Sequence, residues 1–142
     1  MAALPPWPYP KRAAPRGAGK LAPENTLAAL RLGHAHGYRM AEFDVKLSAD
    51  GVAFLLHDAT LDRTTDGTGR ADALDWRELS LLDAGSWHSA PYAGETLPTL
   101  AAVARYCRGN GIAVNIEIKP SPGRERETGA AVAIDAAKLW HR

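Results

Sequence analysis

The chain has 142 residues, of which 46% are hydrophobic and 23% are charged, so its composition is that of an ordinary globular protein and its length suits one domain. A formal net charge of +1 gives no reason to expect a nucleic acid or an acidic membrane surface as a partner. Cys107 is the only cysteine, which excludes an internal disulfide and fits a reducing compartment.

The first half of the chain predicts one helix and two strands. Its proline-rich start lacks the apolar core of a secretory signal, and no apolar run in the chain reaches the roughly 20 residues of a membrane-spanning helix, so we expect a cytoplasmic protein. The predicted elements in order are a strand end and loop over residues 13–17, a helix over 25–35, a strand over 38–47, an Asp-Gly turn over 48–51 and a strand over 52–56.

The second half begins with a long glycine-containing segment, residues 59–97, in which Asp75 and Glu78 have the spacing that caps a short helix. A helix over 100–108, a strand over 114–119 and a helix over 128–140 follow. Strands separated by helices indicate an α/β protein with a parallel sheet. At most four strands can be counted, whereas an eight-stranded barrel takes about 250 residues, so the chain would supply roughly the first half of one.

Two acidic residues, Glu42 and Asp44, alternate with apolar residues in the strand over 38–47. Because side chains alternate between the faces of a strand, both carboxylates should point the same way. Two adjacent carboxylates need a counter-charge, and Mg²⁺ or Ca²⁺ takes oxygen ligands of this kind. On spacing alone, the solvated polar face of an edge strand is the simpler interpretation.

Polar residues of two other strands could contribute to the same site. Asn115, Glu117 and Lys119 share one face of their strand, and a carboxylate beside a lysine suits a metal next to a bound anion. For the strand taken in isolation, a surface Glu–Lys pair is the favoured interpretation. His57 follows a buried apolar strand, where an imidazole could exchange protons near neutral pH or simply belong to a turn. Asp58 beside it could orient the ring.

The order of several longer motifs resembles one enzyme family. PRGAGKLAPENTLAAL, EFDVKLSADG, LLHDATLDRTTDGTG, LDAGSW, GETLPTL and NIEIKP follow one another as do the landmarks of the glycerophosphodiester phosphodiesterases. The resemblance covers nearly the whole chain and is strongest to cytoplasmic bacterial enzymes linked to glycerol 3-phosphate uptake. It implies a partial TIM-type (β/α) barrel, roughly the first half, with a small insertion after an early strand that corresponds to residues 59–97 of a domain spanning residues 1–142.

The resemblance also implies an activity and roles for individual residues. The family hydrolyses glycerophosphodiesters to glycerol 3-phosphate and an alcohol with a divalent metal, Mg²⁺ or Ca²⁺. The substrate would be a small molecule, with neither nucleic acid nor membrane as a partner. The implied roles are metal ligands at Glu42, Asp44 and Glu117, an acid–base histidine at His57, phosphate contacts at Arg16 and Lys119, and a site-shaping residue at Asn25.

The sequence departs from the family pattern at one position of the site. The family motif begins His-Arg-Gly, but here Pro15 precedes Arg16 and Gly17. Proline has no ionisable group, so it cannot act as the second acid–base residue. Three hypotheses therefore remain: a phosphodiesterase weakened by Pro15, an inactive remnant that still binds a metal and a phosphate ester, and a related phospholipase-type enzyme. The absence of a basic amphipathic surface argues against the last.

The length of the chain leads to a further expectation. A half barrel leaves an unpaired strand edge and an uncovered apolar interior. We therefore expect the isolated chain to self-associate or to require a missing C-terminal half.

Overall fold

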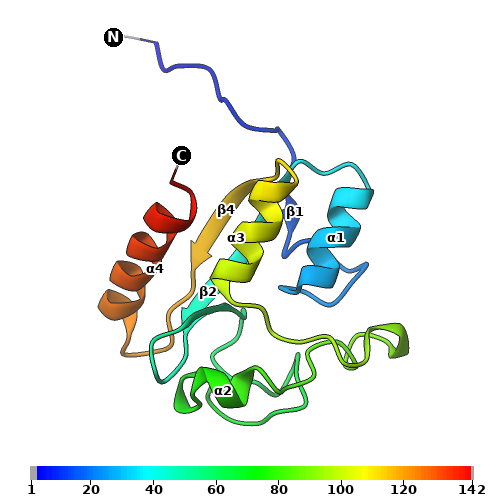
Figure 1. The fold of residues 1–142 in the computed structure, drawn as a ribbon, viewed down its shortest axis with the longest axis vertical. Coiled ribbons are helices and arrows are strands. Elements are labelled where there is room, and N and C mark those ends of the chain that lie inside the picture. Colours follow the sequence, from blue (N-terminus) through cyan, green and yellow to red (C-terminus); the bar gives the residue numbers. More distant parts are fainter. Residues whose placement is uncertain (1–2, 142) are drawn as a thin grey trace.

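The computed structural model describes residues 3–141 and has one small mixed sheet with three longer helices (Figure 1). The elements in chain order are β1 (Ala14–Pro15), α1 (Leu27–Ala35), β2 (Met40–Leu47), β3 (Ala53–Leu55), α2 (Trp76–Leu79), α3 (Leu100–Gly109), β4 (Ala113–Ile118) and α4 (Glu125–Leu139), with single 3-10 turns at Ala71–Ala73 and Ala90–Tyr92. Within the described residues no helix is long and apolar enough to cross a membrane.

The central strand of the sheet is β2. It pairs in parallel with β1 on one edge, where Pro15 is opposite Glu42, and with β4 on the other, where Asp44 is opposite Glu117. Consecutive parallel strands joined through helices are the architecture of a (β/α) barrel. The expected α/β fold is therefore confirmed, with β1, β2 and β4 as its parallel strands.

The strand expected over 52–56 is not part of the parallel set. It forms β3, which runs antiparallel to the end of β2 with Val45 opposite Leu55. Only the turn over 48–51 separates the two strands, whereas a parallel connection needs a crossover of a dozen or more residues. The expectation that this strand belongs to the parallel sheet was wrong, because its short connection allows only a hairpin.

The helices cover one face of the sheet. In Figure 1, α3 lies in front of the strands with α1 and α4 to either side. Phe43 and Val45 of β2 are fully buried and pack in one cluster with Leu100, Val103 and Cys107 of α3. Because these residues of β2 face the helices, the alternate residues of the strand face the opposite way, toward what would be the barrel interior.

Two helices, α1 and α4, start at residues that differ from the sequence expectation by two or three positions. Helix α1 begins at Leu27 and not at residue 25, because Asn25 has a φ of 58° and Thr26 caps the helix by accepting the Ala29 N–H at 3.1 Å. Helix α4 begins three residues earlier than expected, at Glu125, with Glu125 and Glu127 in its first turn, where carboxylates interact favourably with the helix dipole.

Residues 59–97 form a lobe at the end of the molecule where the strands end (Figure 1). Its apolar side chains Leu61, Ala71, Leu79, Ala84 and Leu97 form a second cluster with Phe54 of β3 and Leu56, which follows that strand. Helix α2 starts after Asp75, as its capping spacing predicts, and the Glu78 carboxylate accepts the Asp75 N–H at 3.2 Å. The lobe lies beside the C-terminal ends of the parallel strands, where functional sites of such folds are built.

Candidate metal and phosphate site

Three carboxylates converge at the end of the sheet. Glu42 and Asp44 point from the same face of β2, and Glu117 lies opposite Asp44 in the register of β4. One carboxylate oxygen from each residue lies within 4.8 Å of the other two. A hard divalent cation is held by oxygen ligands in such an arrangement. The structure therefore brings together the three residues that the sequence singled out on two separate strands.

Asp44 is the most constrained member of this carboxylate triad. Its side chain is 1% exposed, and the Asn25 side chain makes two hydrogen bonds with this residue. The Asn25 amide donates to Asp44 Oδ2 at 2.9 Å, and the Asp44 backbone N–H donates to Asn25 Oδ1 at 3.1 Å. The other carboxylate oxygen, Oδ1, is buried and has no hydrogen-bond partner in the described structure. A buried carboxylate oxygen without a partner is costly, so the residues present fit a cation that would complete its coordination.

The pKa values of the triad reflect its crowding. Burial raises the pKa of Asp44, and the nearby Glu117 adds to this, although the Asn25 hydrogen bond opposes it. Burial also raises the pKa of Glu42, with further contributions from the charges of Asp44 and Glu117. A divalent cation would relieve both effects by favouring the charged carboxylates.

Arg16 joins the loop after β1 to the triad. Its backbone has a φ of 49°, and its N–H donates to Glu42 Oε2 at 3.1 Å, while its side-chain Nε lies 3.7 Å from Asp44 Oδ2. The next residue, Gly17, has a φ of 98°, and a side chain there would meet Ala29 of α1 at 2.9 Å. The Arg-Gly pair thus allows the loop to turn tightly between α1 and β2.

His57 is held by a chain of charged side chains that reaches back to Arg16. Its Nδ1 lies 2.8 Å from Asp58 Oδ1, and Arg63 donates to both oxygens of Asp58 and to both oxygens of Glu24. Glu24 also accepts from Arg16 at 3.1 Å. The hydrogen bond from Arg63 holds the pKa of Asp58 well below its usual range, so Asp58 stays charged and fixes the ring.

The Glu24–Arg63 pair was not anticipated from the sequence. The signal that could have found it is weak, because the two residues are 39 positions apart and each alone resembles a surface charge. For Glu24, burial opposes ionisation, but the Arg63 hydrogen bond and the two arginine charges outweigh it and lower the pKa.

Two lysines lie near the triad, one on β2 and one directly after β4. Lys119 contacts Glu117 at 3.3 Å, as the sequence spacing indicates. Lys46, which the sequence analysis overlooked, is 1% exposed, and its amine donates to the backbone oxygens of His57 at 3.2 Å and Lys119 at 3.3 Å. Burial lowers its pKa to about 8. Its position two residues after Asp44 places it on the same face of β2, which is the signal that could have found it.

Pro15 lies directly beside the triad, since it is the partner of Glu42 in the register of β1 and β2. A side chain at this position belongs to the same end of the sheet as Arg16, Glu42 and His57.

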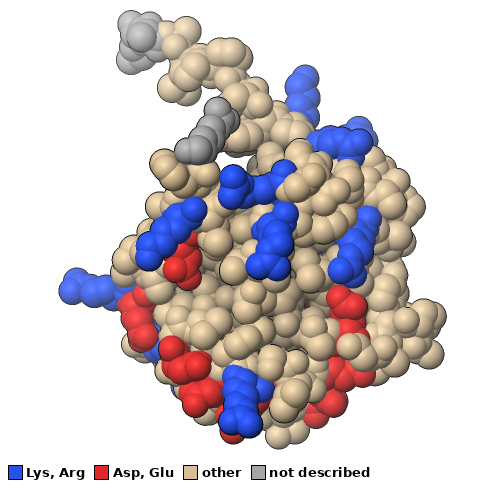
Figure 2. Space-filling view, viewed as in Figure 1, with Lys and Arg blue, Asp and Glu red and all other residues tan. Residues whose placement is uncertain are grey.

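On the face shown in Figure 2, Asp and Glu side chains gather in the lower half, toward the strand ends, and most Lys and Arg side chains lie in the upper half.

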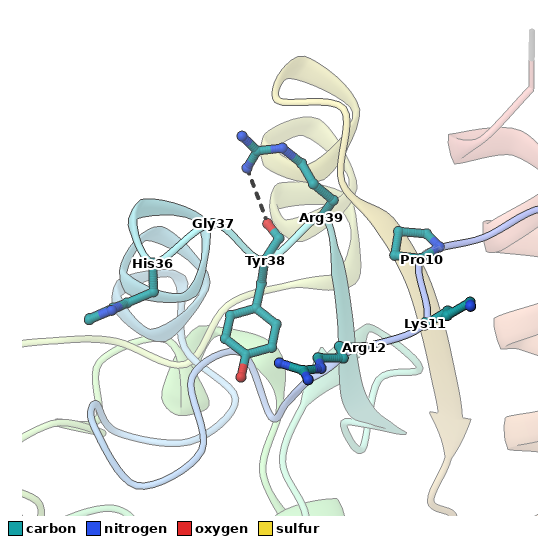
Figure 3. A pocket seen from close by; sticks show the side chains of 7 residues that line it. All are labelled: Pro10, Lys11, Arg12, His36, Gly37, Tyr38 and Arg39. Carbon is teal, nitrogen blue, oxygen red and sulfur yellow. Dashed lines mark hydrogen bonds between the residues drawn. The ribbon is translucent and has the colours of Figure 1, made fainter.

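A separate pocket of about 440 Å³ lies at the opposite end of the strands (Figure 3). Its lining includes Lys11 and Arg12, which precede β1, and Tyr38 and Arg39, which precede β2. Because these residues lie before the strands and the triad lies toward their ends, this pocket is not part of the carboxylate site.

Known proteins share both the sequence pattern and the fold. The model of the glycerophosphoryl diester phosphodiesterase family matches residues 16–141. The glycerophosphodiester phosphodiesterase of Caldanaerobacter subterraneus is 39% identical over 121 residues, which are 82% of this chain and 50% of that protein.

The chain is also similar to solved structures, among them two phosphodiesterases. A phosphodiesterase of Oleispira antarctica in complex with the product sn-glycerol-3-phosphate superposes with a TM-score of 0.84 at 44% identity, over 89% of this chain and 51% of that one. A glycerophosphodiester phosphodiesterase of Agrobacterium tumefaciens superposes with a TM-score of 0.73 at 40% identity, over 84% of this chain and 51% of that one. The chain thus spans about half the length of these relatives.

Proposed function

The chain belongs to the glycerophosphoryl diester phosphodiesterase family, and from this premise we propose that it carries the metal and phosphate site for hydrolysis of glycerophosphodiesters to glycerol 3-phosphate and an alcohol. The observation that supports this most directly is the carboxylate triad, in which one buried oxygen of Asp44 has no hydrogen-bond partner among residues 3–141. The triad would hold Mg²⁺ or Ca²⁺, which when bound neutralises phosphate charge and polarises the phosphoryl oxygen.

The roles of the other residues follow from their positions. Arg16 and Lys119 flank the triad from different strands, so their side chains would bind phosphate oxygens from two sides. Asn25 would keep Asp44 in place through its two hydrogen bonds. Asp58 engages Nδ1 of His57, which leaves Nε2 to transfer a proton to or from an oxygen of the substrate.

Pro15 limits the number of acid–base groups that the site has for hydrolysis. A phosphodiester cleavage needs one group to accept a proton from the nucleophile and another to donate one to the leaving alkoxide. His57 supplies one such group, and the residue beside Glu42, where a second would stand, is a proline. A second candidate function follows: binding of a metal and a phosphate ester with little or no turnover.

The experiment that tests the proposal compares three proteins in an assay of glycerophosphodiester hydrolysis with Mg²⁺ or Ca²⁺. They are the chain itself, a Pro15→His variant and a Pro15→Gln variant, which has a polar side chain but no acid–base group. We expect Pro15→His to raise the rate by about 10²- to 10⁴-fold and Pro15→Gln to leave it low.

Each other outcome has a definite meaning. Equal rates for all three proteins would show that position 15 has no acid–base role. Folded variants that are all inactive but bind glycerol 3-phosphate would favour the binding function. A folded chain that binds neither a divalent cation nor glycerol 3-phosphate would refute both.

A further inference from the structure

Lys46 is a buried charged residue that the proposed chemistry does not use. It is 1% exposed, whereas lysine is almost never buried to this extent without an acidic partner. Asp44 and Asp58 favour its positive charge, but within the part of the chain that the structure describes neither forms an ion pair with it. Its hydrogen bonds go instead to the carbonyl oxygens of His57, at 3.2 Å, and Lys119, at 3.3 Å. The buried amine thus connects a residue that would transfer protons with one that would bind phosphate.

These two hydrogen bonds lie just beyond the backbone pairing of β2. On the side of β3, the pairing among the described residues ends where the Leu56 N–H donates to a carbonyl of β2 at 3.2 Å. On the side of β4, it ends where the Lys119 N–H donates to another carbonyl of β2 at 2.8 Å. The carbonyls of His57 and Lys119 come next along the two segments, and both accept from the Lys46 amine. The Lys46 side chain therefore continues the attachment to β2 where the backbone no longer provides it.

The carboxylate triad is held by other contacts. Glu42 and Asp44 belong to β2 itself, and the parallel register of β2 and β4 fixes Glu117 opposite Asp44. His57 and Lys119, in contrast, follow the paired residues of their segments. A shift of either segment would therefore move an acid–base or phosphate-binding group relative to the metal ligands and leave those ligands in place.

We propose that Lys46 is a positioning residue of the phosphate site, which holds the carbonyl oxygens of His57 and Lys119 and so sets both side chains relative to the carboxylate triad. The proposal rests on the proposed function, because it has meaning only if phosphate binds beside the triad. Lys46 would act through the backbone of these two residues and would not contact the substrate. Such placement matters, since a displacement of about 1 Å at a site can cost about 100-fold in rate.

The test is calorimetric titration of the 142-residue chain with glycerol 3-phosphate in the presence of Mg²⁺, together with titration by Mn²⁺. Lys46→Met keeps the length of the side chain and removes both hydrogen bonds. We expect it to weaken glycerol 3-phosphate binding by about tenfold or more, because a misplaced Lys119 loses a charge-assisted hydrogen bond to phosphate. Its Mn²⁺ affinity should change by less than about threefold. Lys46→Gln, which retains N–H donors, should recover part of the lost affinity.

Val45→Ala is the matched control for a general weakening of β2. Val45 precedes Lys46 in the strand, is fully buried and packs in the cluster that faces the helices. Its truncation should lower the stability of the chain but leave both affinities of the folded protein unchanged, because its side chain lies on the face of β2 away from the site. An equal loss of glycerol 3-phosphate affinity in Val45→Ala and Lys46→Met would show that Lys46 is only structural.

A measurement on the unmodified chain covers the case in which Lys46→Met does not fold. With ¹³C-labelled lysines, the Cε resonance of Lys46 should shift when glycerol 3-phosphate binds, whereas that of the exposed Lys138 on α4 should not. An unresponsive Lys46 resonance, or glycerol 3-phosphate affinity in folded Lys46→Met within about twofold of the unmodified chain, would overturn the proposal. Equal loss of the Mn²⁺ and glycerol 3-phosphate affinities in Lys46→Met would also overturn it. A folded, unmodified chain that binds no glycerol 3-phosphate would instead refute the phosphate site on which the proposal rests.

Discussion

Substitution of Asn25 by alanine should destabilise the chain by about 4 kcal/mol, which is a large part of the 5–15 kcal/mol typical of a domain. Asn25 is 3% exposed and makes two hydrogen bonds to Asp44. Leaving the Asp44 carboxylate without its amide donor costs about 1.5–3 kcal/mol, and the unpaired backbone N–H adds about 1 kcal/mol. The φ of 58° adds about 1–2 kcal/mol for a residue with a Cβ and no side-chain hydrogen bond.

Glycine is the matched control at this position. Asn25→Gly loses the same hydrogen bonds but adopts a positive φ without steric cost, so it should be about 1 kcal/mol less destabilised than Asn25→Ala. Urea denaturation in the presence of a chelator measures both values. The explanation would be refuted by a loss below about 1 kcal/mol for Asn25→Ala, or by a glycine variant that is the less stable of the two.

Three further predictions concern other parts of the molecule. Burial raises the pKa of the Cys107 thiol to about 11. A thiol reagent at about pH 8 should therefore react with Cys107 only after the chain unfolds. Fast labelling of the folded chain would contradict the packing of α3. Because the folded pKa of Asp58 lies below its unfolded value, its contribution to stability is present above about pH 4 and lost as the pH falls further. Asp58→Asn should therefore lower the melting temperature by more at about pH 7 than at about pH 2, and a difference independent of pH would argue against the Arg63 contact. Ile118 is 42% exposed and lies on β4, which among residues 3–141 pairs only with β2. Because one edge of β4 is therefore unpaired, the chain should self-associate, and Ile118→Lys should shift it toward monomers in analytical ultracentrifugation. A monomeric unmodified chain would contradict this.

Much of the site could be predicted from local sequence. The alternation around Glu42 and Asp44 fixes which face of β2 carries the carboxylates, since the period of a strand is two. The proximity of Glu117 required a second step, the parallel register of β2 and β4, which the α/β pattern indicates but does not specify to the residue. The resemblance to the family named Glu117 as a ligand, and the register itself came from the structure.

The features that sequence reasoning missed depend on tertiary contacts. The apolar run that forms β3 fits a parallel or an antiparallel strand equally well, and only the length of the preceding turn distinguishes them. Asn25 looked like the first residue of a helix, but its hydrogen bonds to Asp44 and its positive φ place it before the cap. The contacts of Arg63 with Glu24 and Asp58 join segments whose proximity arises only when the lobe packs below the strands.

Titration of the folded chain with Mn²⁺, followed by electron paramagnetic resonance, tests most directly whether the three carboxylates share one cation. We expect a single high-affinity site that Mg²⁺ or Ca²⁺ displaces and that is lost in Asp44→Asn, while the exposed Asp62→Asn control retains it. Undiminished binding to folded Asp44→Asn, or no binding to the folded chain, would contradict a metal site formed by Glu42, Asp44 and Glu117.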